Sequence, residues 1–79
     1  MKRVFTRRYK ALVQELREAR EKAGLTQEQM AARFDTKQTT ISKIERGERR
    51  LDILGFVDWC QITNTDPGEL LSRIPRQRA

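Results

Sequence analysis

The chain has 79 residues and a formal net charge of +6, and it contains no histidine and a single cysteine, Cys60. This length predicts one small domain, with no second catalytic or ligand-sensing domain. The missing histidines and the lone thiol exclude a histidine base, an intramolecular disulfide and a thiolate metal site. We therefore expect neither an enzyme nor a bound metal or cofactor.

Basic residues gather at both ends of the chain. Five lie in the first ten residues and three in the last seven, whereas residues 11–72 carry nine basic and eleven acidic groups, a net charge of −2. We divide the chain into a basic N-terminal arm (1–6), a domain (7–74) and a basic C-terminal tail (75–79). Basic ends are commonly just solvated, so charge alone is a modest argument for a nucleic-acid partner.

The first predicted helix begins after Thr6 and ends at Gly24. Its inner face carries the apolar residues Leu12, Val13, Leu16, Ala19 and Ala23. Its outer face is charged, which is typical of a helix that covers a core on one side only.

A second helix is predicted from the capping-box pair Thr26 and Gln29, which places its start at about Gln27. Apolar side chains at helical spacing form its buried stripe: Met30, Ala31 and Phe34. The polar residues 35–37 interrupt this stripe and indicate a turn.

A third helix is predicted over residues 38–46, and Gly47 supplies its left-handed stop. Ile41 and Ile44 point inward, while the polar side chains project the other way: Thr39, Ser42, Lys43 and Arg46. An outer face this poor in carboxylates suits an anionic partner.

Two more helices complete an all-α pattern. The fourth is capped by Asp52 and runs to about Thr63, with Asn64 as a left-handed end and an inward stripe of Ile53, Phe56, Val57 and Cys60. Cys60 is thus expected to be a buried structural thiol. The fifth follows the N-cap Asp66, with Pro67 at its first position, and ends after Ile74 because Pro75 follows.

The run from Thr26 to Gly47 resembles the helix-turn-helix of the phage-repressor and Cro-like (Xre-like) family, and the match extends upstream to Arg20 and, more loosely, downstream to about Leu71. The resemblance implies a compact five-helix, lambda-repressor-like DNA-binding domain whose helix-turn-helix is formed by the second and third helices. The sequence departs from the usual pattern at Asp35, in place of the turn glycine, and at Lys37, in place of a capping Ser or Thr. Asp tolerates a positive φ, and Thr36 is the alternative cap for the third helix.

In the resembling family, an arginine late in the first helix pairs with a glutamate at the end of the third. Both residues are present here, as Arg20 and Glu45. The alternative is that each is an independent surface charge. A partly buried pair would fix the angle of the third helix, and removing one partner would then be worse than removing both.

The resemblance implies a small regulator, most simply a repressor. A cytoplasmic protein is the default expectation, because the sequence has neither a bilayer-spanning apolar stretch nor a signal-peptide core, and in a bacterial host it would be associated with the nucleoid. The start of the third helix would meet base edges in the major groove of double-stranded DNA. The expected base contacts are Gln38, Thr39, Ser42 and Lys43. The expected phosphate contacts are Gln27, Lys37, Arg46, Arg49 and Arg50. Gln27 lies at the start of its helix, where both its backbone amide and its side chain would face the DNA backbone, as the matching family glutamine does. For the four basic residues, the alternative is a merely solvated charge.

One domain of this size reads too few base pairs for useful specificity, and relatives bind as two-fold homodimers on palindromic half-sites roughly 34 Å apart. Trp59 and Ile62 lie off the inward stripe of the fourth helix, so we expect them to be at least partly exposed in a monomer and to form the dimer interface. The alternative is that the fifth helix and the tail cover them.

Two other functions stay open. The first is an antitoxin-like module that keeps the fold while its main task is to bind a protein partner such as a toxin. The second is RNA binding, which is disfavoured because Phe34 and Phe56 belong to core stripes and the other aromatic residues form no stacking platform. No membrane partner is expected, since no apolar stretch spans a bilayer and no signal-peptide core begins the chain.

Overall fold

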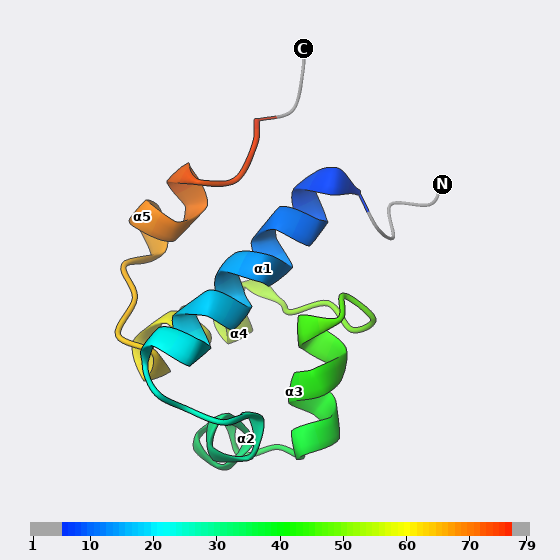
Figure 1. Ribbon diagram of the computed structural model, residues 1–79, viewed down its shortest axis with the longest axis vertical. Helices are drawn as coiled ribbons and strands as arrows, with labels where there is room; N and C mark the ends of the chain where they lie inside the picture. The colour runs from blue at the N-terminus through cyan, green and yellow to red at the C-terminus, as the bar shows by residue number, and fades with distance from the viewer. Residues whose placement is uncertain (1–5, 77–79) are drawn as a thin grey trace.

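The computed structural model describes residues 6–76, which form five helices and no strand. The helices are α1 (Arg7–Lys22), α2 (Gln27–Phe34), α3 (Gln38–Glu45), α4 (Ile53–Ile62) and α5 (Pro67–Ser72). In Figure 1, α1 runs diagonally across the molecule, α2 and α3 lie at one end, α4 lies behind α1, and α5 lies on the other side of α1 from α3. The all-α, five-helix prediction is confirmed.

Local hydrogen bonds set the starts of four helices, as the sequence predicts. The Thr6 hydroxyl accepts from the Tyr9 amide at 3.0 Å, and Thr26 and Gln29 form a complete capping box. The carboxylates of Asp52 and Asp66 cap α4 and α5. These bonds satisfy amides that have no partner inside the helix, so they fix where each helix begins.

The turn between α2 and α3 depends on Asp35, which adopts a left-handed conformation with φ of 57°. Asn64 does the same after α4, with φ of 54°. The positive φ angles expected at Asp35 and Asn64 are confirmed. The alternative cap is wrong: Lys37, and not Thr36, is the N-cap of α3, and it makes no side-chain cap hydrogen bond. Because lysine carries no acceptor, the first amides of α3 lack a side-chain partner there.

The core lies where α1, α2, α3 and α4 meet and α5 closes it. Its most buried large side chains are Leu16, Met30, Ile41, Trp59, Cys60 and Leu70. Leu12, Phe34 and Phe56 are partly buried and pack against this cluster. The predicted inward stripes of α2 and α3 are therefore confirmed.

Trp59 contradicts the prediction that it is exposed at a dimer interface. Its side chain is fully buried, and its indole Nε1 donates to the carbonyl of Leu16 at 3.0 Å. Its ring also meets Phe34 edge to face, with centroids 5.7 Å apart. A buried indole needs a partner for its N–H, and the backbone of α1 supplies it. Ile62 is only partly buried.

Ile53 contradicts the predicted stripe of α4, since it is 81% exposed. The apolar position at this end of the helix is filled by Leu51, which lies before the N-cap and packs against the core. A Cβ on Gly55 would come within 2.9 Å of the Leu51 side chain, so Leu51 folds back over the first turn of α4. Ala23, also expected inside, is exposed because α1 ends before it.

Candidate nucleic-acid interface

The outer face of α3 is polar and faces away from the core. Ile41 and Ile44 are buried on the inner side of the helix. Thr39, Lys43 and Arg46 are exposed at spacings of four and three residues, which places them along one outward line. Gln38 and Ser42 lie beside this line and are partly buried. The residues expected to contact bases therefore lie together on α3, at the edge of the molecule in Figure 1.

The outward line of α3 carries no carboxylate. Glu45 is the single acidic residue in the sequence of α3, and its side chain is only 3% exposed. Arg20 of α1 reaches it with two hydrogen bonds: Nε to Oε2 at 2.6 Å and a terminal nitrogen to Oε1 at 3.1 Å. Another terminal nitrogen of Arg20 donates to the carbonyl of Leu25 at 2.7 Å. The expected pairing of Arg20 and Glu45 is confirmed, and two independent surface charges are excluded.

Gln27 is placed differently from the expectation that its side chain faces the DNA backbone. Its amide nitrogen donates to Glu45 Oε1 at 3.0 Å, and its amide oxygen accepts from Gln38 Nε2 at 2.6 Å. Four side chains, which we call the polar network, are thus connected in series: Arg20, Glu45, Gln27 and Gln38. The network links α1 to the first residue of α3 and holds the Gln38 side chain in place. Sequence patterns placed each residue in its helix, but the contact between the two glutamines depends on how closely α2 and α3 approach.

Arg46 is engaged by an acidic neighbour. Its guanidinium meets the Glu48 carboxylate at 3.0 and 3.1 Å and also donates to the Ser42 hydroxyl. The hydrogen bond and the positive charge of Arg46 lower the pKa of Glu48, and the same contact raises the pKa of Arg46. Both side chains are about half exposed. An anion that approaches Arg46 therefore competes with Glu48 for the same donors.

The remaining basic residues flank α3 unequally. Lys37 and Arg49 are exposed at the two ends of the helix. Arg50 instead stacks its guanidinium over the ring of Tyr9, 4.3 Å from the ring centre, and so lies toward the start of α1.

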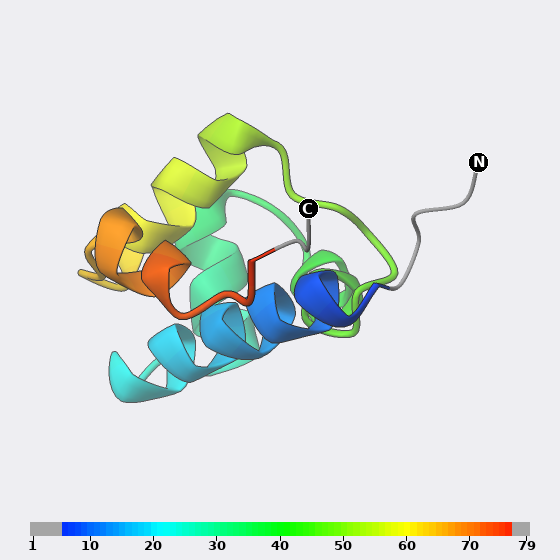
Figure 2. The ribbon, with the colours of Figure 1, turned by 90° about the horizontal axis from the view of Figure 1, so that it is seen from above.

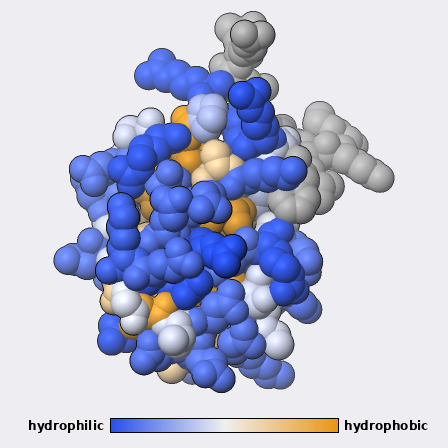
Figure 3. Space-filling view, in the orientation of Figure 1, coloured by the Kyte–Doolittle hydropathy of each residue, from blue (hydrophilic) through white to orange (hydrophobic). Residues whose placement is uncertain are grey.

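Hydrophilic residues cover most of the face in Figure 3, and the orange apolar residues show mainly between α5 and the first half of α1.

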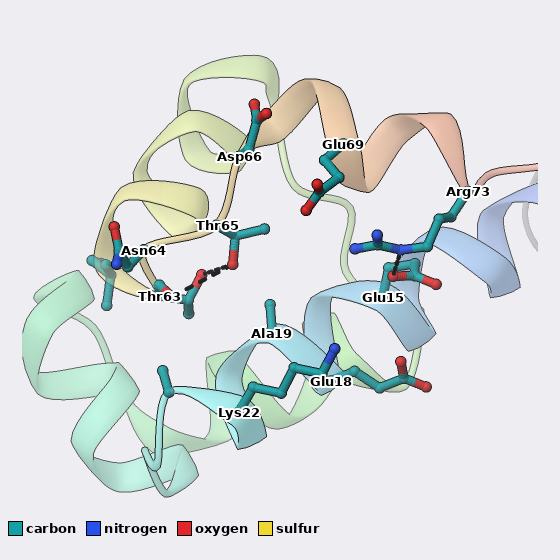
Figure 4. Close-up of a pocket in the computed structure, with 12 residues that line it drawn as sticks. Glu15, Glu18, Ala19, Lys22, Thr63, Asn64, Thr65, Asp66, Glu69 and Arg73 are labelled. Atoms are coloured by element: carbon teal, nitrogen blue, oxygen red, sulfur yellow. Dashed lines mark hydrogen bonds and ion pairs between the residues drawn. The ribbon is translucent and has the colours of Figure 1, made fainter.

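A groove of about 510 Å³ lies between the second half of α1 and the segment from Ile62 to α5. Four carboxylates line it, from Glu15, Glu18, Asp66 and Glu69, against two cations (Figure 4). One of these cations, Arg73, is paired with Glu15 at 2.9 Å, a contact that raises the pKa of Arg73. Carboxylates outnumber cations in this lining, which disfavours the approach of phosphate.

Within residues 6–76, no group of three His, Cys, Asp or Glu side chains is placed to hold a metal ion. Cys60 is buried, and burial together with the nearby charge of Asp66 raises the pKa of its thiol, as expected for a structural cysteine. In the same part of the chain, no helix is both long and apolar enough to cross a membrane.

Comparisons with known proteins agree with this geometry. A family model described as helix-turn-helix matches residues 16–70. The chain is similar to the solved structure of an XRE-family like protein from Pseudomonas syringae pv. tomato str. DC3000, with 51% sequence identity and a TM-score of 0.76. That match covers 82% of this chain and 79% of the other. No curated protein sequence matches the chain.

Proposed function

The chain belongs to the XRE-type helix-turn-helix family of DNA-binding regulators, and from this premise we propose that it is a repressor that binds a specific operator. In this proposal, a homodimer occupies an inverted repeat in nucleoid DNA, with residues 38–46 of each copy in the major groove. The observation that carries the proposal is the outward line of α3, which is free of carboxylates because Glu45 is turned inward and paired with Arg20. Repression is the simplest result, because a bound protein blocks access to the duplex.

Base reading is assigned to Gln38, Thr39, Ser42 and Lys43. The Gln38 amide, already held by Gln27, suits the N6 and N7 edge of adenine, and the exposed Lys43 suits O6 and N7 of guanine. The methyl group of Thr39 suits a thymine methyl. Each good pairing contributes about 1–3 kcal/mol of discrimination against the wrong base.

Positioning on the phosphates is assigned to Lys37, Arg46, Arg49 and Arg50. Lys37 and Arg49 flank α3 and are exposed, which favours a direct contact. Arg46 contacts phosphate in competition with Glu48, and Arg50 does so from its stacked position on Tyr9. For Gln27 we propose that the backbone amide at the start of α2 faces phosphate, while its side chain orients Gln38.

The test is selection of bound sequences from a random duplex library at about 150 mM salt, where non-specific binding is weak. The expected result is an inverted repeat with half-site centres one helical turn apart. The matched variants are Gln38→Ala and Arg49→Ala. We expect the first to relax base preference, and the second to weaken binding to all sequences alike and to reduce the salt slope by about 1.

Two results contradict the proposal. If both variants lose affinity equally on selected and random DNA, the division into reading and positioning roles is wrong. If folded protein enriches no sequence, sequence-specific regulation is wrong. That second result favours the antitoxin-like alternative, in which the chain binds a protein partner such as a toxin. The groove in Figure 4 would be available to such a partner, because its carboxylate-rich lining disfavours contact with DNA.

A further inference from the structure

A second hollow, of about 230 Å³, lies between the first turns of α1, the end of α5 and the loop that joins α3 to α4. We call it the α1–α5 pocket. Figure 2 shows the segment after α5 running beside the start of α1. There the Nε of Arg8 donates to the carbonyl of Pro75 at 2.9 Å. This hydrogen bond connects two of the elements that form the pocket.

One part of the pocket lining is apolar. It consists of Leu12 from α1, Leu71 from α5 and Ile74 just after α5. Leu71 is 50% exposed, and the apolar residues visible in Figure 3 lie mainly on this side of the molecule. An apolar cavity of about 150 Å³ is large enough for benzene. The α1–α5 pocket, at about 230 Å³, therefore has room for one ring or short chain that carries a small polar group.

The charged part of the lining is cationic. Arg8 and Arg50 both line the pocket, and none of the described residues around it carries a carboxylate. The groove in Figure 4 has the opposite balance, with four carboxylates against two cations. A guanidinium has five N–H donors in one plane, so an arginine that already has one partner can also bind a carboxylate. The charge of the α1–α5 pocket thus favours an anion.

Tyr9 supplies the observation that points to a ligand. Its side chain is only 8% exposed and lines the pocket, and its hydroxyl is buried without a hydrogen-bond partner. Buried hydroxyl groups nearly always have a partner, and each exception needs an explanation. The ring of Tyr9 also carries the guanidinium of Arg50, 4.3 Å from its centre. A hydroxyl donor and a cation are therefore held together beside the apolar lining.

We propose that the α1–α5 pocket binds a small apolar carboxylate, of the class of aromatic or short aliphatic acids. The leucines contact the ring or chain, while Arg50 and the Tyr9 hydroxyl bind the carboxylate. Binding itself does not depend on the proposed function. Its consequence does: because Arg50 is assigned to phosphate, a bound carboxylate neutralises one of the charges that hold DNA. Accumulation of the acid then releases the regulator from its operator.

The test uses the full chain with benzoate, which is ionised at pH 7, and with benzamide as a neutral control of the same shape. Amide and methyl signals are followed by NMR during each titration. We expect benzoate to shift the signals of Tyr9, Leu12 and Leu71, and its ring protons to show contacts with the leucine methyl groups. Benzamide should bind about 10-fold more weakly or less. Signals from the groove in Figure 4 should stay in place.

Two variants test the polar contacts. Tyr9→Phe removes the hydroxyl and keeps the ring, so benzoate affinity should fall by about 10-fold while the midpoint of thermal unfolding does not fall. Arg50→Gln should lower benzoate affinity by a similar factor. Its matched control is Arg49→Gln, which changes the neighbouring exposed arginine outside the pocket and should leave benzoate affinity unchanged.

A DNA titration tests the consequence. On the inverted repeat, saturating benzoate should lower the affinity of the unaltered chain and reduce its salt slope by about 1, relative to the same concentration of chloride. Benzoate should have no such effect on Arg50→Gln, which lacks the charge to be neutralised.

Several outcomes overturn the inference. It is wrong if benzoate shifts no pocket signal, if benzamide binds as tightly, or if both Tyr9→Phe and Arg50→Gln bind benzoate as the unaltered chain does. An unchanged DNA affinity at saturating benzoate overturns the release of DNA. A chain that binds benzoate in the pocket but binds no DNA sequence supports the pocket and contradicts the proposed function instead.

Discussion

The buried pair of Arg20 and Glu45 gives the sharpest prediction for stability. The two side chains are 9% and 3% exposed, so a charge left alone there is desolvated and has little access to water. Removing one partner of a buried pair costs about 3–5 kcal/mol. Glu45→Gln also removes the strong acceptor that Arg20 shares with Gln27. Because native proteins have a free energy of unfolding of only about 5–15 kcal/mol, this loss is a large share of the stability of so small a domain.

We therefore expect Glu45→Gln and Arg20→Met each to lower the free energy of unfolding by about 3 kcal/mol or more. In a domain of 60–100 residues, where 1 kcal/mol corresponds to about 4–8 °C, the midpoint temperature should fall by about 12 °C or more. The double variant Arg20→Met with Glu45→Met should lose less than either single variant, because no buried charge is left alone.

The assay is urea unfolding followed by the fluorescence of Trp59, the single tryptophan of the sequence, which is fully buried and reports loss of the core directly. Circular dichroism at 222 nm checks that both probes give one transition. Two results refute the reasoning: single losses below about 1 kcal/mol, or a double variant whose loss equals the sum of the singles. Either would mean that the pair contributes no more than a surface ion pair.

Other contacts give further predictions. Glu48→Gln should strengthen binding to all DNA sequences and steepen the salt slope by about 1, because the charge of Arg46 is no longer neutralised by a neighbouring carboxylate; salt titrations showing an unchanged slope would contradict this. Arg46→Gln should raise the pKa of Glu48 toward its ordinary value in an NMR titration, and the native pair should weaken as the pH falls through the lowered pKa of Glu48. Gln27→Ala should relax base preference as Gln38→Ala does, and library selection would show an unaltered preference if Gln27 does not orient Gln38. Cys60 should react with a thiol reagent at pH 8 far more slowly in the native protein than in urea, and equal rates would contradict its burial and raised pKa.

The helix boundaries were predictable because they depend on neighbours in the sequence. The side chains of Thr26 and Asp52 accept hydrogen bonds from backbone amides in the first turn of the helix that follows each of them. Asp35 and Asn64 end their helices through their own positive φ angles. These interactions need no knowledge of the rest of the fold. The extents of the helices agreed with prediction to within one or two residues for the same reason.

The inner face of α4 was not predictable in this way. The segment is apolar nearly all round, so a stripe through Ile53 and a stripe through Trp59 both fit the period of a helix. The choice depends on α1, whose carbonyl at Leu16 accepts from the indole, and on Leu51, which takes the place expected for Ile53. Contacts between distant segments likewise determine that Gln27 meets Gln38.

The polar network lowers the conformational entropy that Gln38 would lose on contact with a base. Immobilising a flexible side chain at an interface costs about 0.5–1.5 kcal/mol. Gln38 loses part of its side-chain freedom on folding, because Gln27 holds its amide. If the proposed base-reading roles hold, the exposed Lys43 loses its freedom only on binding. In the proposed mode of base reading, α3 thus carries one preorganised side chain, Gln38, and one flexible side chain, Lys43. The base opposite Gln38 should be the most strictly required in the operator, and the base opposite Lys43 the most readily replaced.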